Sequence, residues 1–493
     1  MNNESNVLPL DEVTTLISSN LQENMTFLSE ELSIDKCFDL CYRVIDIGEV
    51  KSVIYFIDGF TRDETLQRIS QFLLGIKKSE MPADVHTFSK RFVPYGEVGL
   101  ETEMKPAIIS LLSGITLLFI EGYDRAITID CRTYPVRSVE EPIKDKVLKG
   151  SRDGFVETLT SNTALIRRRI RDPHLIMEFT RVGERSQTDI SICYLSDKVD
   201  ENMLSDIKDR LSRIKVDALT MNQQSLAECM YPYKWYNPFP KFRFTERPDT
   251  ASACLLEGNV IILVDNSPAA MVLPSSFCDI IEEANDYYFP PITGTYLRLS
   301  RLLTSILALF LTPTFLLLIE NPECIPSWLS FIQISESPNV PFWLQFLILE
   351  FAIDGLKLAA VNTPDMLNTP LSIIAGIVLG EYAVESGWFT AEILLYMAFV
   401  AVASYSQSSF ELGYALKFLR IQFLILTALF SIWGYIAGLV IIILAFTTNK
   451  TITKDSYLYP IKPFSFRKLL RRLIRGRLHY EIVGEKNQNV PKN

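Results

Sequence analysis

Between Thr295 and Phe446 the chain is a series of long apolar runs, and this block constrains the fold more than any other feature. The first run, LRLSRLLTSILALFLTPTFLLLI (297–319), is long enough to cross a bilayer, because about 20 apolar residues in a helix span the hydrocarbon core. Four further apolar stretches follow, at 342–361, 371–388, 391–410 and 421–446. The block predicts an α-helical polytopic membrane domain over residues 293–447.

The charges around these stretches predict their orientation. Arg298 and Arg301 precede the first apolar run, and the loop after it carries three Glu and no Lys or Arg. By the positive-inside rule the first helix then enters from the cytoplasm. The chain ends in a basic tail, which should also be cytoplasmic, so an even number of crossings is expected. Since 342–361 is the least apolar of the five stretches, we expect it to be re-entrant or interfacial, beside four full spans.

The region before the block reads as globular, with an α/β or α+β fold in two parts, 1–145 and 146–292. In the first part, KSVIYFIDGF (51–60) is a strand that ends in a turn, and 109–132 predicts a helix end followed by a β-hairpin. In the second part, 190–195 and 260–265 are strands and 200–215 is an amphipathic helix. Alternating helices and strands predict a soluble, mixed fold ahead of the membrane domain.

The net charge of −10 conceals a strong asymmetry. Residues 449–493 hold 11 Lys and Arg against 3 Asp and Glu, so the remainder is strongly acidic. An acidic body disfavours nucleic acid as a partner, because it offers no broad positive field for phosphates. The start, MNNESNVLPLDEV, has no secretory signal pattern, and the eight Cys are scattered. Both observations predict a cytoplasmic soluble region with reduced thiols.

The sequence shows no recognisable catalytic, metal-binding or cofactor-binding motif. With three His and no CxxC pair, a metal site is not expected, and no nucleophile or cofactor motif is recognisable. The strand ends FIDGF (56–60) and LVDNSP (263–268) lack the glycine pattern of nucleotide-binding loops. We therefore expect a protein that is not an enzyme and has no cofactor.

The basic tail contains a predicted amphipathic helix, FSFRKLLRRLIRGRLHY (464–480). Apolar residues recur at helical spacing, and Arg471, Arg472 and Arg475 lie on the other face. Such a helix is typical of a segment that lies on anionic lipid. The alternative is a solvated basic tail.

Ionisable residues inside the apolar stretches are candidates for an ion pathway. Glu350, Asp354 and Lys357 share one helical face, and Glu381 and Glu385 are one turn apart. Each such group costs about 2.5–3.5 kcal/mol at the centre of a membrane helix, so it cannot face lipid. These side chains either line water or pair inside a protein interface; Lys357 is within reach of Asp354. The polar stretch 404–409 likewise either lines a pore or caps a helix end.

A stripe of small residues accompanies the acidic pair. Gly376 and Gly380 form a GxxxG pattern that Ala383 and Gly387 continue. Small residues at this spacing let another helix approach closely, from the same chain or from a neighbouring copy. Four or five helices can hardly enclose an aqueous path and shield it from lipid. A homo-oligomeric cation channel is thus more economical than a monomeric transporter, which usually needs internal repeats.

The densest charge run of the soluble region is LIRRRIRDPHL, which holds Arg167, Arg168, Arg169 and Arg171. It is interpreted as a solvated or salt-bridged helix face, or as a subunit contact or membrane-facing patch.

Several longer motifs resemble a known family. EEPIKDKVLKGSRDGFVETLTSNTALIRRRIRDPHL (140–175), TERPD (245–249), LLEGNVIILVDNSP (255–268), DYYFPPITGTYLRLSR (286–301) and GEYAVESG (380–387) are similar to the A subunits of spore germination receptors, the GerA family. The resemblance covers roughly residues 45–465. Asn321-Pro322 and Glu381 depart from the pattern of nutrient-receptor subunits, and these departures look most like the stage V sporulation protein AF branch.

The resemblance implies a multi-pass protein of the spore inner membrane, with cytoplasmic N- and C-termini, that acts in germination. Family A subunits have a two-part cytoplasmic domain and an oligomerising membrane domain implicated in cation release. It also implies other germination membrane proteins as partners. A non-conducting scaffold or signal-transducing subunit of a receptor complex is the alternative.

Overall fold

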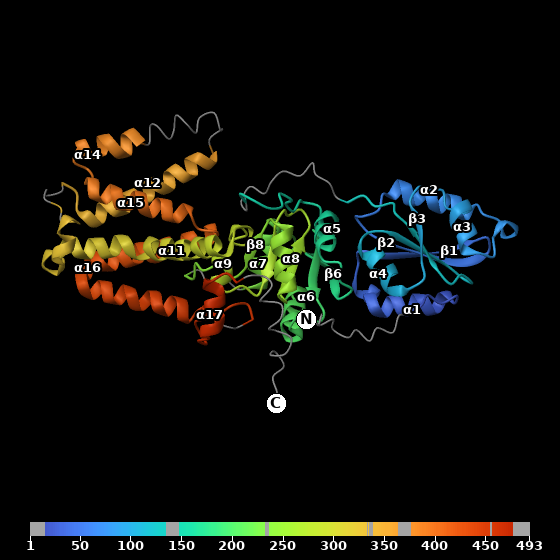
Figure 1. Cartoon of the computed structure of the whole chain (residues 1–493). Coiled ribbons are helices and arrows are strands. Elements are labelled where there is room, and N and C mark those ends of the chain that lie inside the picture. Colours follow the sequence, from blue (N-terminus) through green and yellow to red (C-terminus); the bar gives the residue numbers. More distant parts are fainter. Residues whose placement is uncertain are drawn as a thin grey trace, which may run out of the picture. The chain divides into compact units, whose positions relative to one another are not determined.

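The computed structural model describes residues 15–134, 147–231, 236–332, 334, 339–362, 376–453 and 456–476. The chain forms two compact units (Figure 1). The α/β unit consists of Met1–Pro232 and Phe244–Pro274, and the helical unit of Tyr233–Arg243 and Ser275–Asn493. Residues 275–292 thus belong to the helical unit, although the sequence placed them in the second soluble part. The predicted boundary at 145/146 lies outside the described residues.

The first half of the α/β unit is an antiparallel sheet with helices on both faces (Figure 1). In chain order its elements are α1 (Leu21–Leu32), β1 (Leu40–Ile47), β2 (Val50–Ile57), α2 (Asp63–Leu74), α3 (Val85–Phe92), β3 (Val98–Glu101), α4 (Met104–Leu112), β4 (Thr116–Ile120) and β5 (Ala126–Ile129). The strand order is β1-β2-β4-β5-β3. The predicted hairpin within 109–132 is confirmed, because β4 pairs with β5.

The core of this half follows the apolar spacing of its elements. Leu73 of α2 and Phe88 of α3 pack on Ile54 and Leu118 of the sheet. Strand β2 is buried on both faces over most of its length, so it reads as a continuous apolar run. The predicted α/β character of the soluble region is thereby confirmed.

The second half is built in the same way. Its elements are α5 (Leu159–Arg169), β6 (Leu175–Val182), β7 (Thr188–Leu195), α6 (Glu201–Ser212), α7 (Asn222–Met230), β8 (Arg243–Thr245), α8 (Pro248–Leu256), β9 (Val260–Val264) and β10 (Ala270–Leu273). The strand order is β6-β7-β9-β10-β8, which repeats the first order strand for strand. The α/β unit is therefore a structural repeat, which the sequence analysis did not detect.

Matching hydrogen bonds extend the repeat to side chains. In the first half, Glu121 after β4 accepts the first backbone N–H of α1, from Leu21, at 2.9 Å. In the second half, Asp265 after β9 accepts the first N–H of α5, from Leu159, at 3.1 Å. A carboxylate at a helix N-terminus satisfies an unpaired donor and complements the helix dipole. In both halves, an acidic residue directly after a strand thus caps the N-terminus of a helix that is distant in the sequence.

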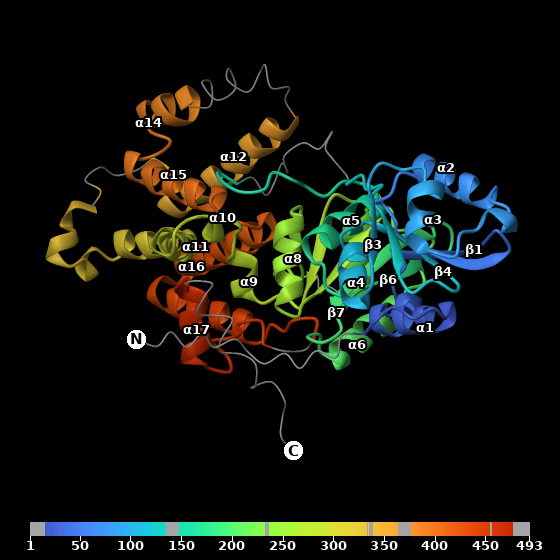
Figure 2. The same cartoon turned by 45° about the vertical axis from the view of Figure 1, so that its right-hand side comes forward.

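The helical unit contains the apolar block. Its elements are α9 (Phe277–Ile281), α10 (Asn285–Tyr288), α11 (Pro291–Glu320), two 3-10 helices (Pro322–Cys324 and Ser327–Ile332), α12 (Phe342–Asn362), the π-helix η5 (Ile377–Tyr382), α14 (Ala383–Glu385), α15 (Ala391–Tyr405), α16 (Phe410–Thr447) and α17 (Phe466–Leu473). Both α15 and α16 pack along α11 (Figure 2). Within the described residues, α11 and α16 are long and apolar enough to cross a membrane, and α15 is a shorter apolar helix.

Helix α16 is a hairpin and not the single continuous span that the sequence predicted over 421–446. Ser431 has non-helical backbone angles, φ 50° and ψ −126°. The rings of Phe423 and Tyr435 lie 4.7 Å apart, whereas twelve residues of straight helix would separate them by about 18 Å. The chain therefore reverses at Ser431 and packs its two arms together.

Two glycines of the second arm permit this close packing. A Cβ atom at Gly434 would meet Leu426 O of the first arm, and one at Gly438 would meet the ring of Phe423. Gly434 and Gly438 form a GxxxG pattern, and small residues at this spacing let helix backbones approach. Such a role was predicted for Gly376 and Gly380 from the sequence, but not for Gly434 and Gly438.

Candidate functional site: a charge network among apolar helices

The predicted face of α12 meets two cations of α16. Glu350 is buried, and its Oε1 lies 2.6 Å from Arg420 Nε. Lys417 Nζ lies 3.2 Å from Glu350 Oε2 and also pairs with Asp354. Lys417 and Arg420 are buried as well. The four groups form a neutral network between α12 and the first arm of α16.

Backbone carbonyls complete this network. Arg420 Nη1 donates to Ala308 O of α11 at 2.7 Å, and Lys417 Nζ donates to the carbonyl of Glu350 at 3.1 Å. A buried guanidinium needs several acceptors, and here a carboxylate and a carbonyl from different helices provide them. The network thus ties α11, α12 and α16 together.

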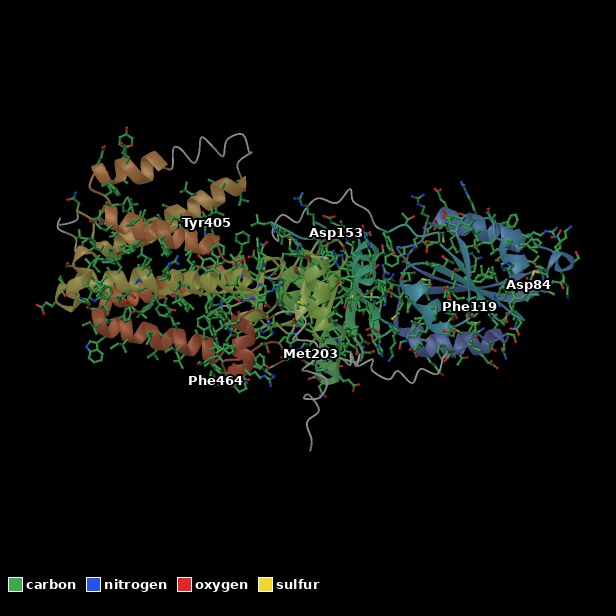
Figure 3. The ribbon with its side chains drawn as sticks, in the orientation of Figure 1. Asp84, Phe119, Asp153, Met203, Tyr405 and Phe464 are labelled. Carbon is green, nitrogen blue, oxygen red and sulfur yellow. The ribbon has the colours of Figure 1, made fainter. Side chains whose placement is uncertain are left out.

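Lys357, the third charged residue of the predicted face, points to aromatic rings. Its Nζ lies 4.8 Å from the ring centroid of Tyr405, on α15 (Figure 3), and 5.7 Å from that of Tyr414, on α16. Cation–π contacts of this length stabilise an ammonium group away from water. From the sequence, Glu350 and Asp354 could either line a water-filled path or pair within the protein. In the protomer both carboxylates are paired with Lys417 and Arg420, two residues that were not predicted as partners.

The second acidic pair has a different environment. Glu381 and Glu385, on η5 and α14, are both exposed within the protomer. Cβ atoms built at Gly376 and Gly380 meet no atom within 4 Å in the described part of the chain. The acidic pair and the GxxxG pattern thus lie on a segment with uncovered surface.

Gly387 has a role other than the predicted packing stripe. Its φ of +71° is left-handed, and its N–H donates to Val384 O at 2.9 Å. This is the geometry with which glycine commonly ends a helix. Ala383, in contrast, is buried and belongs to an apolar cluster with Phe346 and Ile393.

The polar stretch 404–409 caps helices. Ser409 is the N-cap of α16 and accepts the N–H of Leu412 at 3.3 Å. Ser406 donates to Ala403 O at 2.9 Å, and Gln407 Oε1 accepts from Ser305 of α11 at 2.9 Å. Of the two interpretations left open for this stretch, these contacts match the capping one.

A second charge cluster surrounds the start of α11. Arg301 donates to both oxygens of the fully buried Asp286, each at 3.0 Å, and Arg298 lies 2.7 Å from Glu282. Arg472 of α17 joins the cluster through Asp279 at 2.8 Å and Glu282 at 3.1 Å. We call these six residues, Asp279, Glu282, Asp286, Arg298, Arg301 and Arg472, the basal clasp. It fixes the helix base to α9, α10 and the tail.

The tail is shorter as a helix than predicted. Helix α17 ends at Leu473, and residues 477–480 of the predicted helix lie outside the described residues. Arg472 is held in the basal clasp, and Arg475 donates to Phe289 O. The Arg472 guanidinium and Nη1 of Arg475 therefore bind protein groups, and the side chain of Arg471 is not among those described. Arg467 and Lys468 are exposed.

Comparison with known proteins identifies the family. The family described as "Bacillus/Clostridium GerA spore germination protein" matches residues 27–482. The chain belongs to the GerA spore germination family. The resemblance inferred from the sequence motifs is thus confirmed.

Two relatives and one solved structure illustrate the similarity to other GerA-family proteins. The chain is 33% identical to Stage V sporulation protein AF of Bacillus subtilis (strain 168), over 95% of this chain and 96% of that protein. It is 28% identical to Spore germination protein GerLA of Bacillus cereus, over 93% and 94%. The N-terminal domain of the A subunit of the Bacillus megaterium spore germinant receptor GerK3 is 24% identical, with a TM-score of 0.43, over 54% of this chain and 99% of that domain.

The Arg cluster of this GerA-family chain is part of the folded α/β unit. Arg167 is fully buried and pairs with Asp39 at 2.8 Å. Arg168 stacks on Tyr134 with 4.6 Å between guanidinium carbon and ring centroid, and Arg169 lies 3.1 Å from Asp153. These contacts match the salt-bridged interpretation of the cluster.

The sequence of this GerA-family chain contains a pattern that points to Lys417 and Arg420, the two network residues that were not predicted. Lys417 and Arg420 are three apart on α16, and Glu350 and Asp354 are four apart on α12. Complementary charges at helical spacing on two apolar segments indicate pairing between those segments. The predicted span began at 421 and so excluded both cations.

Proposed function

We propose that this chain is a membrane subunit of a spore germination complex, and that several copies assemble around a path through which cations leave the germinating spore. The observation that carries the proposal is the exposure of Glu381 and Glu385 on an apolar segment beside the uncovered Gly376 and Gly380. Carboxylates at membrane depth cannot face lipid. A neighbouring copy that packs on the glycines would give them a wet lumen instead.

The proposed topology is multi-pass, in the inner membrane of the spore. Arg298 and Arg301 at the start of α11 and the basic tail support cytoplasmic N- and C-termini. With α16 as a hairpin, the membrane segments are α11, α12, the segment that includes η5 and α14, α15 and the two arms of α16. They are six, an even number as both ends on one side require, so the proposal counts α12 as a crossing and not as the re-entrant or interfacial segment expected from its sequence.

The charge network limits which carboxylates serve the path. Glu350 and Asp354 are neutralised inside one protomer, so they hold helices together in this proposal. Glu381 and Glu385 remain as the groups that attract cations. Lys357, stacked on two tyrosines, is assigned to helix packing.

Two measurements test the proposal together. The first is the mass of the full-length protein in detergent, with its bound detergent subtracted, and the second is K⁺ release from liposomes that contain it. We expect an oligomer and a K⁺ release above that of empty liposomes. A monomer that releases no K⁺ would contradict the proposal.

A second candidate function is a non-conducting scaffold of a germination receptor complex. It is favoured by the neutral network, because charges that are paired in a dry contact contribute nothing to a pore. In that case the protein co-purifies with other germination membrane proteins and its liposomes hold their K⁺.

A further inference from the structure

The start of α11 carries apolar side chains that no element of the described residues covers completely. Ile292 and Tyr296 are 82% and 68% exposed, and Leu299 is 46% exposed. Their spacing of four and three residues places them on one helical face. With Ile474 and Arg475 of the tail they line an open groove of about 430 Å³.

The groove lies at headgroup depth if α11 crosses the membrane. Thirty residues of helix are about 45 Å long, whereas the hydrocarbon core is about 30 Å thick. Arg298 and Arg301, held in the basal clasp, must stay outside that core, so the apolar crossing begins after Arg301. Ile292, Tyr296 and Leu299 precede it and lie where lipid headgroups meet acyl chains.

The charge beside the groove is positive. Arg475 lines the groove itself, and Arg467 and Lys468 of α17 are exposed. The acidic residues of the basal clasp are engaged by Arg298, Arg301 and Arg472. Two apolar residues close to these basic residues in the sequence are also exposed: Phe464 (Figure 3) is 70% exposed and Phe466 is 66% exposed. Basic and apolar groups side by side are typical of a surface that binds anionic lipid.

We propose that this groove binds one anionic phospholipid of the bilayer, with an acyl chain along Ile292, Tyr296, Leu299 and Ile474 and the phosphate at Arg475. The exposed Arg467 and Lys468 raise the local concentration of anionic lipid around the site. The bound lipid fills the space between the base of the first membrane helix and the tail. This inference is independent of cation conduction.

Native mass spectrometry of the full-length protein tests it. Protein in detergent is mixed with dioleoyl phosphatidylglycerol or, separately, with dioleoyl phosphatidylcholine, and the retained lipids are counted. We expect at least one phosphatidylglycerol per chain to be retained and phosphatidylcholine to be lost. Ile292→Glu places a negative charge in the groove and should weaken phosphatidylglycerol binding more than tenfold. Replacing both Arg467 and Lys468 by Gln should weaken it by about fivefold for each lost charge.

A matched control separates the groove from general electrostatics. Ile461→Glu adds the same charge at an exposed residue of the tail region that does not line the groove. We expect it to weaken binding less than Ile292→Glu does. Equal retention of the two lipids, or equal effects of the two Glu variants, would overturn the proposal. A change in oligomer mass in Ile292→Glu with unchanged lipid retention would also overturn it, because a second copy would then cover the groove.

Discussion

Arg167 of the second half of the α/β unit and Asp39 of the first form a buried, bidentate ion pair. Arg167 Nε lies 2.8 Å from Asp39 Oδ2, and Nη2 lies 3.1 Å from Oδ1. The two side chains are 0% and 2% exposed. Arg167 also donates to Leu175 O at 3.1 Å, at the start of β6. The pair therefore locks the two repeats to each other through their strand ends.

Removing one member of this pair should destabilise the protein strongly. Asp39→Ala leaves Arg167 buried without its counter-ion, which typically costs about 3–5 kcal/mol. We expect a lower melting temperature of the full-length protein, measured by circular dichroism in detergent because the five Trp all lie in the helical unit. The double variant Asp39→Leu with Arg167→Met should recover most of the loss. As a control, Arg181→Ala breaks an exposed pair with Asp189 and should cost less than about 1 kcal/mol.

The same logic applies to Glu350 and Arg420 between α12 and α16. Glu350→Ala leaves the buried Arg420 without its carboxylate and Lys417 with Asp354 alone, and we expect it to lower the melting temperature and the yield of folded protein. Glu323→Ala, in the loop after α11, is the control and should change neither. If Glu350→Ala melts like the wild type and abolishes K⁺ release, then Glu350 lines the path and the pairing assignment fails.

A larger side chain should have different effects in the two GxxxG patterns: lower stability at Gly438 and a smaller oligomer at Gly376. Gly438→Leu drives a side chain into the Phe423 ring, so it should destabilise the hairpin by about 1–3 kcal/mol. Gly376→Leu meets no atom of the described residues, so the melting temperature should hold while the oligomer mass falls. The two readouts are thermal unfolding and size-exclusion chromatography with light scattering. Loss of stability without loss of oligomer mass in Gly376→Leu would contradict an intersubunit role.

The stability of the helical unit should rise with pH because of Lys241. Its Nζ is buried and donates to Lys450 O at 2.7 Å and to Asn449 Oδ1, at the end of α16. Burial lowers the pKa of Lys241 from 10.5 to about 8. The unfolded chain then binds more protons than the folded chain between pH 8 and 10.5, so the free energy of unfolding increases across this range.

The total increase is up to about 3 kcal/mol, and the stabilisation is lost as the pH falls through 8. Melting temperatures at pH 7.5, 8.5 and 9.5 check this. Relative to Lys241→Met, the wild type should gain stability at each step. Parallel curves for the two proteins would show that Lys241 titrates normally.

Much of the fold could be predicted from the local sequence pattern. The apolar run at 297–319 was recognisable by its length and hydropathy, and the strands predicted in 51–60, 190–195 and 260–265 by their nearly continuous apolar residues. The repeat was not recognisable, since its two halves share strand order and capping geometry but few residue identities. Glu121 and Asp265 have the same role, yet only the backbone N–H groups that they accept reveal it.

The candidate site could be predicted only in part. Periodicity placed Glu350, Asp354 and Lys357 on one face of a helix, but the partners of that face depend on which helix packs against it. Lys417 and Arg420 reach the face because α16 begins at Phe410 and turns back at Ser431. A hydropathy pattern cannot show this turn, since the residues on both sides of Ser431 are equally apolar.

The release of K⁺ from liposomes by acidic-pair variants tests the account most directly. Glu381→Gln with Glu385→Gln is compared with the wild type and with Glu392→Gln, which changes a partly exposed carboxylate at the start of α15. The account predicts that the double variant keeps its oligomer mass and melting temperature and loses at least tenfold in K⁺ release, while Glu392→Gln conducts like the wild type. Unchanged K⁺ release in the double variant would contradict it.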